Sequence, residues 1–412
     1  LPTMRPRSVI RAIDNRNASR RIGVDHKHIQ PEMAAIEAEM IALRRRLHAH
    51  PELGFEEHAT SDLVAGFLTT WGYRVTLGLG GTGVVGTLTR GPGKRLGLRA
   101  DMDALPIRET TGLPHASRCD GVMHACGHDG HTAMLLAAAR CLAERERFTG
   151  TLNLIFQPAE EGLGGAKRMI DDGLFAQFPC DAVFAMHNVP GLPAGVLGFC
   201  DGPAMASADE VRVRVTGRGG HGAAPHTTID PVVVCASIVM ALQTVVSRNV
   251  NPQELAIVTA GSIHAGTASN VIPSHADLAL SVRALSPDVR ALLERRIREI
   301  VHGQAASYGA TAEIDYRHEY PVLVNHAAET AFARDVAREW GGDGALIPHL
   351  RPIAASEDFA FMLNACPGSY LSIGNGDGAA GCGLHHPGYD FNDACLATGA
   401  SYWIALAERY LA

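Results

Sequence analysis

The chain has 412 residues, of which 46% are hydrophobic and 19% are charged, values typical of a globular protein rather than a disordered or fibrous one. Its length exceeds that at which one hydrophobic core usually stops growing, so two domains are expected. The net charge of −7 and the lack of a basic stripe argue against nucleic acid as a partner.

The cysteines and the apolar segments predict where the protein works. Nine cysteines form an odd total without a CxxC pair, which argues against a disulfide framework and favours a cytoplasmic location. Residues 1–32 are basic and lack the apolar core of a secretory signal, so we interpret them as a disordered N-terminal extension. The longest apolar stretch, 231–242, is shorter than the roughly 20 residues that cross a bilayer, so we expect a buried helix and no membrane partner.

Two helices are predicted at the start of the larger domain, at 33–50 and 59–71. The glycines of the next segment, Gly78, Gly80 and Gly83, match the GxGxxG pattern of dinucleotide-binding loops. Such a loop must open a helix, whereas here the β-branched sequence VVGTL follows. We therefore predict a hairpin turn and no nucleotide site.

Strands and helices alternate in the following segment. Apolar strands are predicted at 95–100, 151–157 and 180–189, with a helix at 131–145. This alternation is typical of an α/β domain with a largely parallel sheet. Function in such sheets gathers at the carboxyl ends of the strands, and Asp103, Glu160 and His187 each lie where an apolar run ends. We expect these three side chains to share a site.

From about residue 208 the pattern changes. The segment 208–320 contains strands and helices in the order β-α-β-β-α-β, which is the ferredoxin-like arrangement. The remainder, 321–412, returns to α/β character. The predicted fold class is therefore α/β with two domains. A mostly parallel-sheet domain is formed by 33–207 and 321–412, and a ferredoxin-like domain is inserted between them.

Residues 123–131, MHACGHDGH, concentrate histidine, cysteine and aspartate in one short stretch. Imidazole, thiolate and carboxylate are the ligands that divalent transition metals take. Comparable groups follow predicted strands in RADMDALP (99–106), in QPAEEG (157–162) with MHN (186–188), and in LHHPGYDFND (384–393). These segments predict a metal site.

The number of candidate ligands favours two metal ions over one. A single catalytic metal needs three protein ligands, and these segments offer more. Glu160 and Glu161 are adjacent, and neighbours in an extended or turning segment point in different directions. One carboxylate can then hold a metal while the other faces the activated water. Such a pair of ions with a spare base suits hydrolysis of an amide bond.

The chain resembles the M20 metallopeptidase family in motifs that occur in the same order: RADMDALPI, MHACGHDGH, QPAEEG, MHN, GGHGAAPH, SNVIP and LHHPGYDFND. The most similar branch comprises hippurate hydrolases, N-acyl-amino-acid amidohydrolases and plant indole-acetyl-amino-acid hydrolases. The resemblance extends from Met33 to Ala412. It implies a catalytic domain that holds two divalent metal ions per subunit, zinc or manganese, with nickel or cobalt also compatible.

The resemblance also implies roles for individual residues. The metal ligands it implies are Cys126, His128, Glu161, His187 and His385. It implies that Glu160 is the general base and that Asp103 orients a ligand. Of the adjacent His385 and His386, the first aligns with the ligand, because the family usually has a small polar residue at the second position.

The inserted domain resembles the family's lid and dimerisation domain, which implies a homodimer. His221 in GGHGAAPH resembles the residue that reaches a partner subunit's site and stabilises the oxyanion. Asn270 in SNVIP and Arg283 in SVRAL resemble a clamp for the substrate's α-carboxylate. These three residues are therefore the predicted substrate-binding set.

The leading hypothesis is an amidohydrolase that converts N-acyl or N-aroyl amino acids to a carboxylic acid and a free amino acid. Two alternatives within the same class are a deacetylase of a biosynthetic intermediate, such as N-acetyl-diaminopimelate, and an aminobenzoyl-glutamate hydrolase. A metal-binding protein without catalysis is the alternative from a different class. Glu160 argues against it, because a site that only binds metal needs ligands but no spare base.

Overall fold

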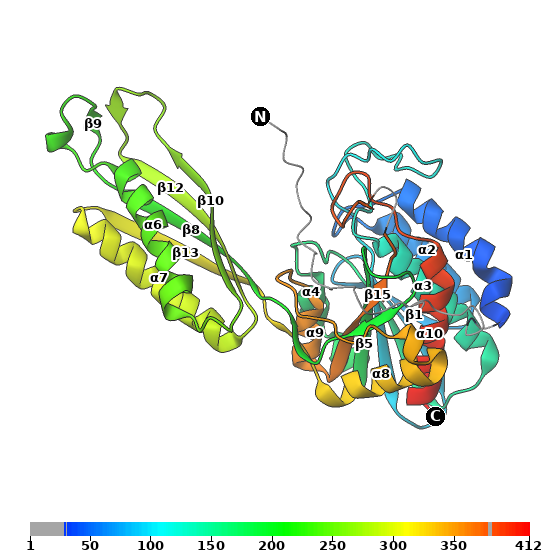
Figure 1. The fold of residues 1–412 in the computed structure, drawn as a ribbon. Coiled ribbons are helices and arrows are strands. Elements are labelled where there is room, and N and C mark those ends of the chain that lie inside the picture. The colour runs from blue at the N-terminus through cyan, green and yellow to red at the C-terminus, as the bar shows by residue number, and fades with distance from the viewer. Residues whose placement is uncertain (1–28, 30, 378–380) are drawn as a thin grey trace. The chain divides into compact units, whose positions relative to one another are not determined.

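The computed structural model describes residue 29 and residues 31–377 and 381–412, so most of the predicted N-terminal extension lies outside the described residues. The chain forms two compact units (Figure 1). Unit 1 comprises the described residues up to Phe199, together with Ala327–Leu350 and Cys366–Ala412. Unit 2 comprises Cys200–His326 and Arg351–Ala365.

Unit 1 is built on a seven-stranded sheet with the order β1-β2-β4-β3-β5-β15-β6. Its strands are β1 Arg74–Leu79, β2 Gly83–Arg90, β3 Arg95–Asp101, β4 Gly150–Gln157, β5 Ala182–Val189, β6 Leu197–Phe199 and β15 Gly368–Gly374. The four central strands, β4, β3, β5 and β15, run parallel, whereas the outer pairings are antiparallel. The α/β class is confirmed, and the glycine-rich segment forms the predicted hairpin between β1 and β2.

Helices cover this sheet and complete its core. They are α1 Pro31–Ala49, α2 His58–Thr70, α3 His128–Arg145, α4 Gly165–Asp171, α5 Leu174–Gln177, α8 Ala327–Gly341 and α10 Ala394–Tyr410, with a short 3-10 turn at Asp343–Ala345. Helix α3 packs on β3 and contacts both α1 and α10. It is buried over most of its length, and Leu135, Leu136 and Leu142 are fully buried, as expected of a helix enclosed by other elements.

Unit 2 contains the predicted β-α-β-β-α-β order. Its elements are β8 Ala208–Thr216, α6 Pro231–Asn249, β10 Ala256–Ala265, β12 His275–Ala284, α7 Pro287–Ser307 and β13 Thr311–Tyr320. The sheet order is β10-β12-β8-β13, with antiparallel neighbours. In β8 the alternate residues Val211, Val213 and Val215 are buried, because one face of the sheet packs against both helices.

The expectation of a buried helix at 231–242 is wrong for one of its faces. Helix α6 buries Ile238, Leu242 and Val245 in the core of unit 2. Val233 and Met240 are 50% and 71% exposed, because the helix has a sheet on one side only. Among the described helices, α6 alone is long and apolar enough to cross a membrane. This is weak evidence for a membrane span, because core helices can have the same length and composition.

The observed units differ in extent from the predicted domains. Unit 2 contains the segment 208–320, but it also includes 351–365 and the short helix α9 Phe359–Ala365. Two strands outside 208–320, β7 Gly202–Met205 and β14 Leu323–Asn325, pair with each other. The backbone of Ala206 donates to Ile353 and Ala355. These pairings join segments that are far apart in the sequence, and no periodic pattern in the sequence predicts them.

Candidate active site

Three neighbouring strand ends bring the predicted carboxylates and histidine together in unit 1. Strand β3 lies between β4 and β5, all three parallel, so their carboxyl ends lie at one edge of the sheet. Asp103 follows β3, Glu160 follows β4, and His187 lies within β5. The backbone N–H of Glu161 donates to Asp103 Oδ2 over 2.9 Å. Glu160 and Asp103 are buried, as the sequence predicts for a shared site.

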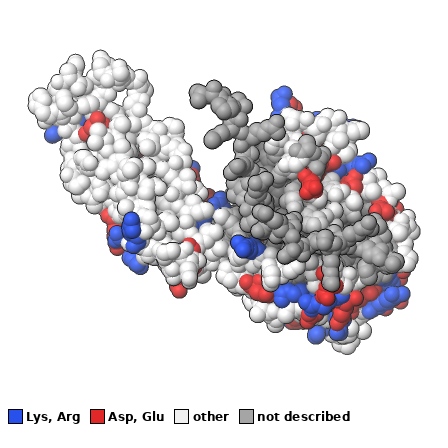
Figure 2. Space-filling model, in the orientation of Figure 1, with Lys and Arg blue, Asp and Glu red and all other residues white. Residues whose placement is uncertain are grey.

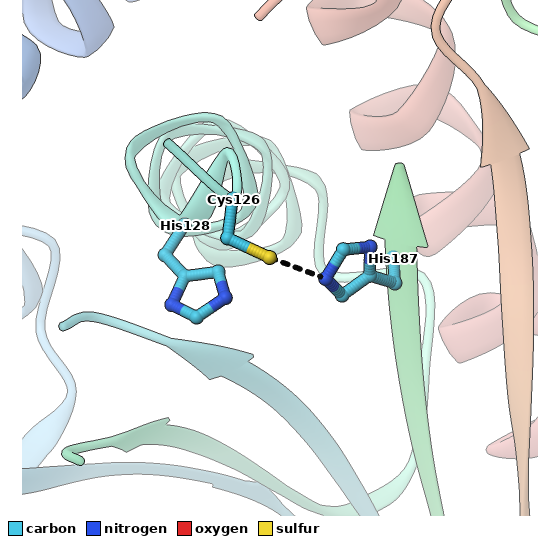
Figure 3. Close-up of side chains that lie close together, drawn as sticks. All are labelled: Cys126, His128 and His187. Carbon is cyan, nitrogen blue, oxygen red and sulfur yellow. Dashed lines mark hydrogen bonds between the residues drawn. The ribbon is translucent and has the colours of Figure 1, made fainter. Parts of the chain in front are cut away.

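The start of α3 supplies a thiol and an imidazole to the same place. Cys126 Sγ lies 3.4 Å from His187 Nε2, and His128 stands beside them at the first position of α3 (Figure 3). One potential ligand atom from each lies within 4.8 Å of the others. Gly127 adopts a φ of +94° here, and a Cβ would lie 2.5 Å from Asn188 Oδ1. Only glycine fits this close approach.

A second group of potential ligands shares Cys126. Glu161 and His385 place ligand atoms within 4.8 Å of each other and of Cys126, and His385 Nε2 lies 3.1 Å from Glu161 Oε1. The backbone N–H of His385 donates to the carbonyl of Ala125 over 2.8 Å, which ties this loop to the start of α3. His386 instead uses Nδ1 to accept a hydrogen bond from the backbone of Gly388.

Hydrogen bonds fix which ring nitrogen each histidine presents. His128 Nδ1 lies 3.1 Å from Asp103 Oδ1, and His187 Nδ1 lies 2.7 Å from the carbonyl of Asn188. Each acceptor holds a proton on Nδ1, so Nε2 is left to face the cluster. Among the described residues His128 Nε2 is buried without a hydrogen bond, and Asp101 Oδ2 lies 3.7 Å from it. A buried nitrogen of this kind fits a metal ligand better than a core residue.

The electrostatics of the cluster favour a cation. Burial raises the pKa of the Cys126 thiol well above its usual range, and Glu161 and Glu160 raise it further. Burial, together with His131, lowers the pKa of His187 well below its usual value, so this imidazole is neutral, the form that binds metals. A divalent ion among these groups would stabilise the thiolate and compensate the carboxylates. The residues present therefore fit a metal centre.

A buried charged network lies behind this centre. Arg44 of α1 forms ion pairs with Asp129 at 2.9 Å, with Asp390, and with Asp393 at 3.4 Å. His48 Nδ1 also lies 2.9 Å from Asp129. Asp129 follows His128 in sequence, and Asp390 belongs to the segment that carries His385. Arg44 thus joins helix α1 to two of the segments that carry potential ligands.

Arg44 is not among the residues predicted for the site, although the sequence of α1 contains a signal for its burial. Met40, Leu43 and Leu47 recur at helical spacing and are buried, and Arg44 and His48 fall on the same face of α1. Charged residues within an apolar stripe predict a buried polar network rather than a solvated face. Their partners could not be predicted, because these lie far away in the sequence.

The predicted substrate-binding residues all lie in unit 2, at two places. Val271 pairs with His221 in the short strands β9 Gly220–His221 and β11 Val271–Ile272, and Asn270 accepts a hydrogen bond from the backbone of Gly222. Figure 1 shows β9 at one end of the unit. Arg283 lies near the other end of β12, about 27 Å from His275 at a rise of about 3.4 Å per residue. The structure thus groups His221 with Asn270 and places Arg283 apart.

Comparison with known proteins identifies the family. The model of peptidase family M20/M25/M40 matches residues 97–409. A hippurate hydrolase of Campylobacter jejuni is 45% identical over 382 residues, which are 92% of this chain and 99% of its own. An IAA-amino acid hydrolase of Arabidopsis thaliana is 37% identical over 379 residues, 90% of this chain and 86% of its own.

A solved structure supports the same conclusion. A dinuclear metal-binding peptidase of the M20 family from Bacillus subtilis is 33% identical, covers 92% of this chain and 99% of its own, and superimposes with a TM-score of 0.80. That relative binds two metal ions on the same fold. The chain therefore belongs to the M20 peptidase family and is an amidohydrolase that acts on small-molecule substrates.

Proposed function

We propose that the protein is a two-metal amidohydrolase that cleaves N-acyl or N-aroyl amino acids, such as hippurate, to a carboxylic acid and a free amino acid. The observation that carries this proposal is the sharing of Cys126 between two ligand groups, one with His128 and His187 and one with Glu161 and His385. These residues together would hold two divalent ions, with Cys126 available to both groups, and zinc, manganese, nickel and cobalt all accept this donor set. The 45% identity to a hippurate hydrolase supports the substrate class.

The chain's own residues divide the work of hydrolysis. Two divalent ions held there would polarise the substrate carbonyl and acidify a water molecule to near neutral pH. Glu160 is buried beside His128 and Glu161. It takes a proton from the attacking water and delivers it to the leaving amine. Asp103 keeps the proton of His128 on Nδ1 and holds the backbone of Glu161.

We propose that the lid acts on substrate through a dimer. Asn270 and Arg283 lie too far apart to hold one carboxylate from the same chain, so the two residues would reach one substrate only from different chains, with Asn270 and His221 supplied by the partner subunit. The α6 side of unit 2 shows few charged side chains (Figure 2), and β10 is an edge strand. Both features favour association of two copies.

Hybrid dimers test the action in trans. A mixture of inactive Glu160→Gln and inactive His221→Ala chains should regain hippurate hydrolysis after subunit exchange, because each hybrid holds one complete composite site. If mass spectrometry shows that the subunits exchange but activity does not recover, the proposed arrangement is contradicted.

A substrate panel tests the proposed reaction. Hippurate, N-acetyl amino acids, N-acetyl-diaminopimelate and aminobenzoyl-glutamate are assayed with the purified protein before and after exhaustive chelation. We expect the highest kcat/KM for an N-acyl or N-aroyl amino acid, loss of turnover on chelation, and recovery with zinc or manganese. A clear preference for N-acetyl-diaminopimelate or aminobenzoyl-glutamate would replace the proposed substrate, and full turnover in metal-free protein would refute the mechanism.

A further inference from the structure

One loop, Glu52 to Glu57, contacts the backbone on both sides of the candidate site. The carbonyl of Glu52 accepts a hydrogen bond from the N–H of Ala104 over 2.8 Å, directly after Asp103. Glu57 Oε1 accepts a hydrogen bond from the N–H of Ala159 over 2.8 Å, directly before Glu160. The loop therefore links the ends of strands β3 and β4.

Ala159 has an unusual backbone conformation. Its φ is +52°, in the left-handed region that residues with a Cβ rarely adopt. It is fully buried, so its N–H would have no water to bind if Glu57 were absent. The backbone of Gly54 packs closely against this residue, since a Cβ at Gly54 would lie 3.0 Å from the Cα of Ala159. The turn after β4 is thus held in a conformation that an alanine would not favour without contacts such as the hydrogen bond to Glu57.

The turn is fixed at two points, and Glu160 lies between them. Glu57 binds the N–H of Ala159 on one side, and Asp103 Oδ2 binds the N–H of Glu161 on the other. With both amides fixed, the backbone of Glu160 has little freedom. Its carboxylate and that of Glu161 place oxygens within 4.8 Å of each other and of a nitrogen of His128, so the turn sets how both carboxylates face the candidate site.

Glu57 itself is a buried carboxylate. Burial raises its pKa, and a hydrogen bond from Thr82 acts in the opposite direction. The Oε2 atom accepts that bond from Thr82 Oγ1 over 2.5 Å, so both oxygens of the fully buried side chain have a donor. In the described residues Glu57 belongs to none of the groups that could hold a metal. Burying a carboxylate is costly, so a buried carboxylate outside the metal-ligand groups is expected to have another structural role.

We propose that Glu57 is a positioning residue for the general base. By accepting the N–H of Ala159 it stabilises the left-handed turn and so aims the carboxylate of Glu160. This inference rests on the proposed role of Glu160. Asp103 still holds Glu161 when Glu57 is lost, so the metal ligand should be disturbed less than the base.

A double-mutant cycle with Ala159 tests the proposal. Glu57→Ala should lower kcat about 5- to 30-fold, which corresponds to the left-handed penalty of about 1–2 kcal/mol, with metal content retained. Ala159→Gly alone should change kcat little. Combined with Glu57→Ala it should restore most of the loss, because glycine adopts the turn without help. Glu57→Gln should retain most activity, since its amide oxygen still accepts from Ala159.

Glu52→Ala is the matched control, because this side chain accepts from the first amides of α2, Ala59 and Thr60, and not from the turn. Ala159→Gly should not rescue any loss that it causes. The proposal is overturned if Glu57→Ala has the kcat of the wild type. It is also overturned if Ala159→Gly rescues Glu57→Ala and Glu52→Ala equally. If Glu57→Ala does not fold, wild-type-like kcat in Glu57→Gln supports it and a loss as large as that of Glu160→Gln overturns it. Glu160→Gln is assayed in parallel to separate the role of Glu57 from the role of Glu160. Full activity of Glu160→Gln would refute Glu160 as the general base, whatever the result for Glu57.

Discussion

Within the segment 208–320, all of which is described, Asp209 is the only buried charged residue, whereas unit 1 buries Arg44, Asp129 and His48 in a single network. Burying a charge is costly unless it is paired. In unit 1 this cost falls beside the candidate site, where Arg44 joins α1 to the segments that carry potential ligands. The inserted domain is built on an aliphatic core and presents its polar residues on the surface.

The largest expected effect comes from breaking the network of unit 1. Arg44→Met should lower the free energy of unfolding by about 3–5 kcal/mol, because it removes the guanidinium that pairs with the buried Asp129 and the partly buried Asp390 and Asp393. Urea unfolding followed by tryptophan fluorescence reports unit 1, since all three tryptophans, Trp71, Trp340 and Trp403, belong to it.

The matched variant in unit 2 is Arg290→Met. Arg290 pairs with the buried Asp209, but Asp209 also accepts a hydrogen bond from Tyr316 Oη over 3.0 Å. The loss should therefore be smaller, about 1–3 kcal/mol, and should shift the circular dichroism transition more than the fluorescence. Equal shifts for Arg44→Met and Arg290→Met would mean that the contrast between the network of unit 1 and the segment 208–320 has no effect on stability.

A smaller effect should appear in substrate recognition by the lid. Arg283→Ala should lower kcat/KM for N-acyl amino acids about 10- to 150-fold, which corresponds to about 1.5–3 kcal/mol for hydrogen bonds to a charged group. The matching amino amides lack the carboxylate and should be little affected. Arg283→Lys should recover part of the loss, because lysine keeps the charge but lacks the planar guanidinium that binds a carboxylate through two hydrogen bonds. An unchanged acid-to-amide ratio would make Arg283 structural.

The smallest expected effect is on pH dependence. Although burial opposes it, Asp129 and Glu109 raise the pKa of His48 from 6.5 to about 9. A raised pKa gives stability that is fully present below pH 6.5 and is lost as pH rises through 9. The urea midpoint from tryptophan fluorescence should fall over this window, by less than the change caused by Arg44→Met. His48→Gln should flatten the curve, and a midpoint in wild type that rises over the window contradicts the assignment.

The two units also differ in how much of them could be predicted. The order of elements in 208–320 follows from local patterns, because alternate residues such as Val211 and Val213 face one core. The inclusion of 351–365 in unit 2 could not be predicted, since it depends on backbone hydrogen bonds to Ala206 across a long sequence separation. Local patterns also could not show that α6 has only one covered face.

The candidate site divides in the same way. Motifs and strand ends predicted that Asp103, Glu160 and His187 come together. The support behind them was missed, because Glu57 and Arg44 act through partners more than eighty residues away. Residue type alone says that such charges are surface groups. Only the packing of α1 and its following loop shows otherwise.

The most direct test of the account is metal content measured with hippurate turnover on the same preparations of wild type, Glu160→Gln and Glu161→Gln. Glu160→Gln should keep two ions per chain and lose at least about 10²-fold in kcat, the lower range for general acid–base catalysis. Glu161→Gln should lose metal. If the two variants lose metal equally, or if Glu160→Gln turns over hippurate like wild type, the division between base and ligand at these adjacent glutamates is contradicted.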